Sequence, residues 1–90
     1  MEKAIITVVG KDREGIIANV CTHLAESKIN ILDISQTILD GYFNMMMIVD
    51  ISHSSTEFSI LVKELEKLGE DIGVVIKLQH EAIFQKMHRI

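Results

Sequence analysis

The 90-residue sequence has no proline, no tryptophan, three Phe, one Tyr and a single cysteine. Because Cys21 stands alone, an intrachain disulfide is excluded and a reducing compartment is favoured. With so few aromatic residues, the core has to be built from Ile, Leu, Val and Met. No Gly/Ser linker or low-complexity tract interrupts the chain, so a single continuous domain is predicted.

Runs of positive charge are also missing. The basic residues are scattered singly and the formal net charge is −4. Nucleic-acid-binding domains present a basic face, and clusters of Lys and Arg are what anionic membranes attract. The apolar stretch Ala4–Val9 is too short for a signal-peptide core or a membrane span. The sequence therefore predicts no nucleic-acid partner, no membrane partner and a cytoplasmic location.

Hydrophobic periodicity predicts six elements in the order β-α-β-β-α-β. An apolar helical face predicts a first helix from Ile16 to about Ser27. The S-x-x-E pattern of Ser54 to Glu57 predicts a capping box for a second helix, which Gly69 would terminate. Strands are predicted at Lys3–Val9, Asn30–Leu39, Phe43–Ile51 and Gly73–Gln79.

This order predicts an α+β fold, a ferredoxin-like βαββαβ sandwich with a four-stranded antiparallel sheet and both helices on one face. In the second strand, alternation groups Leu32, Ile34, Gln36 and Ile38 on one side and Ile31, Asp33, Ser35 and Thr37 on the other.

The helix-free face of this sheet would mix Ile5, Val9 and Val75 with polar side chains. Such a surface predicts a homodimer interface. The remaining residues, 81–90, have Ile83, Phe84, Met87 and Ile90 at helical spacing. They predict a short C-terminal amphipathic helix, which is too short to be stable alone and must dock on its own sheet or on a partner.

No pattern in the chain indicates catalysis. Cys21 lies on the apolar face of its predicted helix, and Ser54 and Ser55 are explained as helix caps. No nucleophile is paired with a base, so an enzyme is not predicted. The histidines lack metal-ligand spacing, and no metal or cofactor is predicted; they are His23, His53, His80 and His88.

The run from Gly10 to Gly15 follows a strand and opens a helix, as phosphate-binding loops do. Ile16 and Ile17 stand where a Walker loop has Lys and Ser or Thr, which excludes that class. Unpaired N–H groups and the helix dipole remain there and could hold a carboxylate. Alternatively, Asp12 or Glu14 caps the helix and Gly15 permits close packing. The local pattern leaves both interpretations open.

Together these segments resemble an ACT domain. That family has a strand, then D-x-x-G-[LIV], a helix, and an Asn-Ile start to its second strand. Here the corresponding segments are Val8–Ile17, Leu24-Ala25 and Ile29-Asn30-Ile31. The resemblance covers about residues 3–80, which divides the chain into an ACT-like domain (1–80) and an amphipathic extension (81–90). It is most similar to the ACT modules of formyltetrahydrofolate deformylase and of the glycine-cleavage-system regulator.

The resemblance implies a non-catalytic regulatory module that binds a small molecule, typically an amino acid, and acts as a homodimer or higher homo-oligomer. The ligand would lie between the loop before the first helix and the second strand of a neighbour. Many members have Pro where this chain has Glu14, which puts a negative charge beside the carboxylate seat. The alternative is an interaction-only protein that oligomerises or docks on a metabolic enzyme without a ligand. Carried over residue by residue, the ligand-binding residues are Gly10, Asp12, Gly15, Ile16, Asn30 and Ile31.

Overall fold

The computed structural model describes residues 1–11 and 14–82. Within them, the elements follow the predicted order. They are β1 (Lys3–Lys11), α1 (Ile16–Glu26), β2 (Asn30–Leu39), β3 (Tyr42–Asp50), α2 (Phe58–Ile72) and β4 (Val74–His80). The predicted ferredoxin-like fold is confirmed over these elements. The short helix predicted for the C-terminal extension falls on residues 83–90, outside the described residues.

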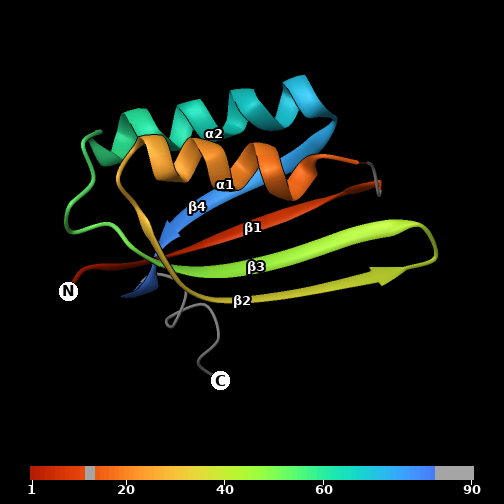
Figure 1. The fold of residues 1–90 in the computed structure, drawn as a ribbon, viewed down its shortest axis with the longest axis horizontal. Coiled ribbons are helices and arrows are strands. Elements are labelled where there is room, and N and C mark those ends of the chain that lie inside the picture. Colours follow the sequence, from red (N-terminus) through yellow and green to blue (C-terminus); the bar gives the residue numbers. More distant parts are fainter. Residues whose placement is uncertain (12–13, 83–90) are drawn as a thin grey trace.

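The sheet is antiparallel, with strand order β2-β3-β1-β4. β1 lies in the interior of the sheet and is hydrogen-bonded to β3 on one side and β4 on the other. Both helices pack on one face (Figure 1). In that view they lie over β1 and β4, whereas β2 extends beyond them as an edge strand.

Strand alternation places the core between the sheet and the helices. Ala4, Ile6 and Val8 of β1 point toward the helices and are fully buried, and the neighbouring positions of β3 are Met45 and Met47. The helices complete this layer with aliphatic side chains: Ile16, Val20, Leu24, Leu61 and Leu65. Full burial of each such side chain is worth roughly 1.5–3 kcal/mol, so this layer is the main source of stability.

The pairing of β2 with β3 corrects one prediction about side-chain faces. The register shifts between Ile31 and Asp33, so that Leu32 is an extra residue in the ladder. Ile31 pairs with Val49 and Ile34 with Met47, both of which face the helices. The bulge therefore places Ile31 on the same side as Ile34, where strict alternation had placed it on the opposite side.

The predicted start of α2 is also wrong. Ser54 and Glu57 do not form a capping box, because Glu57 itself is the N-cap residue and makes no side-chain cap hydrogen bond. Instead, the Ser54 hydroxyl donates to the carbonyl of Thr56 at 2.9 Å and accepts its backbone N–H at 3.1 Å. These bonds close a local turn before the helix, an alternative use of serine that competes with capping.

Gly69 does not end α2 as predicted; the helix continues to Ile72 and ends at Gly73, whose φ is +81°. The role of Gly69 is close packing. A Cβ atom there would lie 2.6 Å from the carbonyl oxygen of Val74 and 3.2 Å from the Cγ1 atom of Ile76. The absence of a side chain thus lets α2 approach the backbone of β4.

We expect Gly69→Ala to destabilise the protein by about 1–3 kcal/mol, as overpacking does. Alanine favours helices by roughly 1 kcal/mol over glycine, so propensity alone predicts the opposite sign. The free energy of unfolding in urea measures the change. Lys67→Ala, at an exposed position of the same helix, is the control and should change it by less than about 0.5 kcal/mol. A more stable Gly69→Ala variant would show that the contact with β4 is not tight.

Candidate functional site

The junction between β1 and α1 provides the features expected of a carboxylate seat. Gly15 is the N-cap residue of α1, with φ of +84°, a conformation that glycine adopts without strain. Its surroundings are open: a Cβ there would meet only Asn19 Nδ2, at 3.3 Å, within 4 Å. No side chain makes a cap hydrogen bond among the described residues, and the first turn holds no acidic residue. Glu14 is exposed and does not cap the helix, while Asp12 lies outside the described residues.

Gly10 and Ile16 flank this junction but contribute mainly to packing. A Cβ at Gly10 would lie 2.7 Å from Cγ1 and 3.0 Å from Cα of Val74 on the neighbouring strand. Ile16 is only 2% exposed, and its side chain belongs to the core. Ile16 can therefore offer a ligand its backbone N–H but not its side chain.

Asn30 and Ile31 lie at the opposite end of the sheet from Gly10. Gly10 pairs with Phe43 of β3, whereas Asn30 pairs with Asp50 at the other end of the same strand. Seven residues of antiparallel strand separate Phe43 from Asp50, which corresponds to roughly 24 Å. The predicted ligand-binding residues described by the structure therefore form two separate groups, and one chain does not bring them together.

Asp50 is a charged group beside Asn30 that the sequence prediction missed. Its carboxylate accepts hydrogen bonds from the hydroxyl and the backbone N–H of Ser52. Chiefly the hydroxyl bond and then the N–H bond hold the pKa of Asp50 below its ordinary value of 3.8. Asp50 is thus a carboxylate at neutral pH, next to one of the two residue groups. The Asp-x-Ser pattern at the end of a strand was the sequence signal for it.

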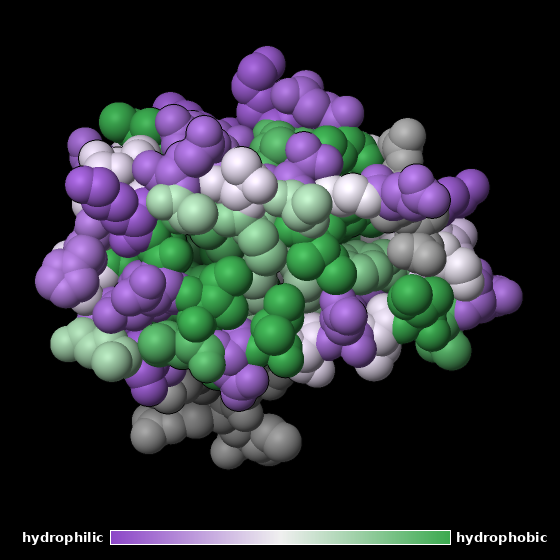
Figure 2. Space-filling view, viewed as in Figure 1, coloured by the Kyte–Doolittle hydropathy of each residue, from purple (hydrophilic) through white to green (hydrophobic). Residues whose placement is uncertain are grey.

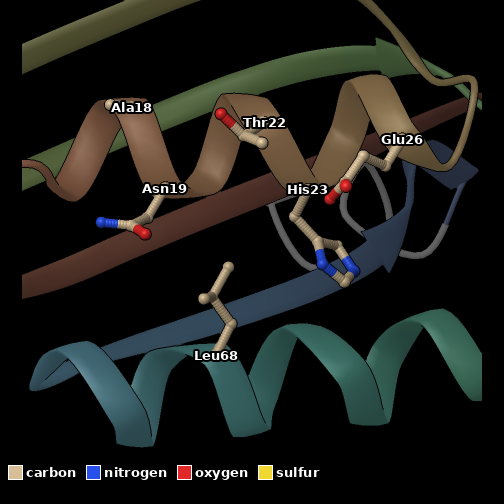
Figure 3. Close-up of a pocket in the computed structure, with 6 residues that line it drawn as sticks. All are labelled: Ala18, Asn19, Thr22, His23, Glu26 and Leu68. Atoms are coloured by element: carbon tan, nitrogen blue, oxygen red, sulfur yellow. The ribbon is translucent and has the colours of Figure 1, made fainter.

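A shallow hollow of about 280 Å³ lies between the two helices (Figure 3). His23 points from α1 toward α2, and its Nε2 atom lies 3.2 Å from Oε1 of Glu64. This pair joins the helices and shows that Glu64, predicted to be simply solvated, has a partner. The hollow is lined by Ala18, Asn19, Thr22, His23, Glu26 and Leu68. Its polar lining gives it no match to an apolar ligand pocket.

The described residues contain no group of three or more His, Cys, Asp or Glu side chains placed to hold a metal ion. The predicted separation of the histidines agrees with this for His23, His53 and His80. Over the same part of the chain, no helix is long and apolar enough to cross a membrane. Cys21, predicted to be buried, is partly exposed.

The family comparison matches this fold and this loop. The family model for the ACT domain covers residues 2–79, and the chain belongs to the ACT domain family. Membership implies a regulatory ligand-binding role, typically toward amino acids. Within the family it is similar to the UPF0237 protein of Bifidobacterium longum, with 63% identity over the full length of both chains.

Solved structures agree. The ACT domain protein from Streptococcus pneumoniae is 50% identical, with a TM-score of 0.82 over 93% of this chain and 94% of that one. A formyltetrahydrofolate deformylase from Pseudomonas syringae shares the fold at 18% identity and a TM-score of 0.81, over 89% of this chain and 28% of that chain. A putative glycine cleavage system transcriptional repressor does so at 22% and 0.74, over 88% and 45%. The predicted family resemblance is confirmed.

We expect Ser52→Ala to raise the pKa of Asp50 toward 3.8, because both the hydroxyl bond and its support of the turn are lost. Since the folded-state pKa is lowered, the stabilisation from this pair is present above pH 3.8 and is lost as the pH falls below it. Wild type and variant should therefore converge in stability in acid. An NMR titration of the Asp50 carboxyl carbon measures the pKa. Ser59→Ala, which removes a hydroxyl bonded to Glu57, should leave that titration unchanged; an unmoved pKa in Ser52→Ala would contradict the assignment.

Proposed function

We propose that the protein is a non-catalytic regulatory module that binds an amino acid between two copies of the chain, in the cytoplasm. The observation that carries the proposal is the separation of the family-matched residues. Gly15 and the uncapped start of α1 lie at one end of the sheet, and Asn30 and Ile31 lie at the other. Only a second copy can bring the two groups together.

The edge strand β2 supplies a way to do this. All ten of its residues are exposed, including Ile31, Ile34 and Ile38 on the side that faces the helices. Figure 2 shows hydrophobic side chains gathered on the helix side of the molecule, over the part of the sheet that the helices leave bare. A bare, apolar edge strand is a template for pairing with another strand.

Pairing of two β2 strands about a two-fold axis is antiparallel, so each strand's start lies beside the other's end. The start of β2 carries Asn30. Its end pairs with Phe43, which is next to Gly10 and close to the start of α1. Such a dimer therefore brings Asn30 of one copy toward Gly15 of the other, and it makes two equivalent sites.

The charges at the two ends suit an amino acid. The N–H groups of the first turn of α1 and the helix dipole attract the ligand carboxylate. Asn30 and the carboxylate of Asp50 at the other end attract its ammonium group. A zwitterion thus meets opposite charges at its two ends, whereas either group alone has nothing to hold the second charge.

The alternative function, an interaction-only protein, is favoured by the same separation if β2 pairs with a different protein. In that case the two residue groups never meet and no ligand is bound. The experiments below separate these possibilities.

The first test concerns the interface. We expect Ile34→Lys to dissociate the dimer into 10.2 kDa monomers, because it places a charge in the centre of the apolar strip. Sedimentation equilibrium at micromolar concentration measures the mass. Val75→Lys is the matched control, since Val75 is also an exposed strand residue but lies on the helix-free face. A wild-type monomer would overturn the proposal, and dissociation by Val75→Lys alone would place the interface on the helix-free face, as the sequence predicted.

The second test concerns the ligand. At a hundredfold excess over Kd, a bound amino acid stabilises the fold by about 2.7 kcal/mol. For a chain of this size, that raises Tm by several degrees or more. We expect one or more of the twenty amino acids to do so in a melting screen. Gly15→Asn should abolish the shift, because it adds a side chain at the seat while tolerating positive φ; Gly15→Val would strain the backbone. A screen without any shift favours the interaction-only function.

A mixing experiment then tests whether the site is shared. Asn30→Lys should also abolish the shift, because its charge repels the ligand ammonium. A heterodimer of Gly15→Asn and Asn30→Lys chains has one site with both changes and one with neither. Mixing the two variants should therefore restore binding to about half of the wild-type stoichiometry by calorimetry. If the mixture stays inactive although heterodimers form by native mass spectrometry, the site does not lie between copies.

A further inference from the structure

Ile5 is buried on the face of the sheet that has no helix. Strand alternation points Ala4 and Ile6 toward the helices and Ile5 away from them, yet Ile5 is only 5% exposed. It is absent from the core cluster that forms beneath the helices. Val9, at the other end of the same face of β1, is 47% exposed. The helices cannot account for this difference, because they lie on the opposite side of the sheet.

Burial on this face is confined to one end. Ile48 and Gln79, the residues opposite Ile5 on β3 and β4, are half-buried. Val75, at the far end of β4, is 59% exposed. Beside Ile48 lies a hollow of about 220 Å³ with largely apolar walls, formed by Asp33, Ile34, Ser35, Met46 and Ile48. One end of the helix-free face thus has both a covered isoleucine and an apolar hollow next to it.

The C-terminal segment begins at this end. Gln79 pairs with Ile5, and β4 ends one residue later at His80. The eight residues that follow the described chain, 83–90, include Ile83, Phe84, Met87 and Ile90. We propose that this segment lies across the helix-free face of its own sheet, where it covers Ile5 and places apolar side chains in the hollow beside Ile48.

The reach and the charges fit this occupant. The hollow lies between β2 and β3, two to three strand spacings from β4, which is roughly 10–14 Å. Eight residues span about 12 Å as a helix and more than 20 Å when extended. Asp33 and Asp50 lie on this face at the same end of the sheet, and the segment carries Lys86 and Arg89. Opposite charges therefore meet at the rim of the apolar contact.

A thiol at position 5 reports whether the segment covers it. In the full chain with Cys21→Ser and Ile5→Cys, we expect the thiol to react slowly with 5,5′-dithiobis(2-nitrobenzoate). Adding Phe84→Asp and Met87→Asp should raise the rate at least tenfold, because a segment with two new charges leaves the apolar face. The same two changes should not alter the reactivity of Val75→Cys, the matched thiol on the uncovered end of the face. Equal rates at position 5 with and without the charges would overturn the proposal, since neighbouring sheet side chains would then be the cover.

A disulfide test decides which chain supplies the segment. With Cys21→Ser, Ile48→Cys and Met87→Cys, mild oxidation should join positions 48 and 87 within one chain. On non-reducing electrophoresis the product then runs as a monomer, and digestion yields the linked peptide. A disulfide-linked dimer as the main product would assign the cover to a second copy, and an unlinked chain would show that the segment lies elsewhere. Either result would overturn the proposal. Unlike the ligand-binding tests, these readouts do not depend on an amino acid, so the two proposals can fail separately.

Discussion

The close approach of α2 to β4 at Gly69 determines much of the molecule's layout. Because a Cβ there would lie 2.6 Å from a β4 carbonyl oxygen, the helix can sit low over that side of the sheet only with glycine at this position. α1 then packs beside α2, joined to it by His23 and Glu64. Both helices are thereby held toward β1 and β4, and the opposite edge, β2, is left bare.

The bare edge connects the fold to the proposed function. A helix layer centred over all four strands would bury Ile34 and Ile38 and leave no apolar surface for a second chain. The offset layer instead exposes them, and it does so beside two groups of polar atoms that a single chain keeps apart. Stability and recognition thus depend on the same packing decision, and the exposed apolar area is the energetic cost that association recovers.

The sequence predicted the element order well, because each element has a strong hydrophobic period; the bounds of β2 agree to the residue. It failed where one residue has two possible roles. Gly69 resembles a helix terminator in a local pattern, and its actual role depends on β4, which follows it. Ser54 makes a turn with Thr56 instead of a cap. The bulge at Leu32 has no signature of its own, so the face of Ile31 was assigned wrongly.

The candidate site was predictable only as a set of residue types at matching positions. Sequence could indicate that Gly15 tolerates the left-handed conformation and that Asn30 begins a strand. It could not show that they lie at opposite ends of the sheet, because that separation follows from the register of β1, β2 and β3. Asp50 was overlooked for a related reason, since its neighbour across the ladder is remote in sequence.

The bulge at Leu32 also limits what β2 can join. It leaves an unbroken ladder from Asp33 to Leu39, whose middle residue is Gln36. A one-residue slip would turn every side chain to the other face, so a paired strand has one favourable register, with the symmetry axis passing near Gln36. Two chains joined in this way have each used the same edge. The assembly therefore closes on itself at two members instead of growing into a fibre.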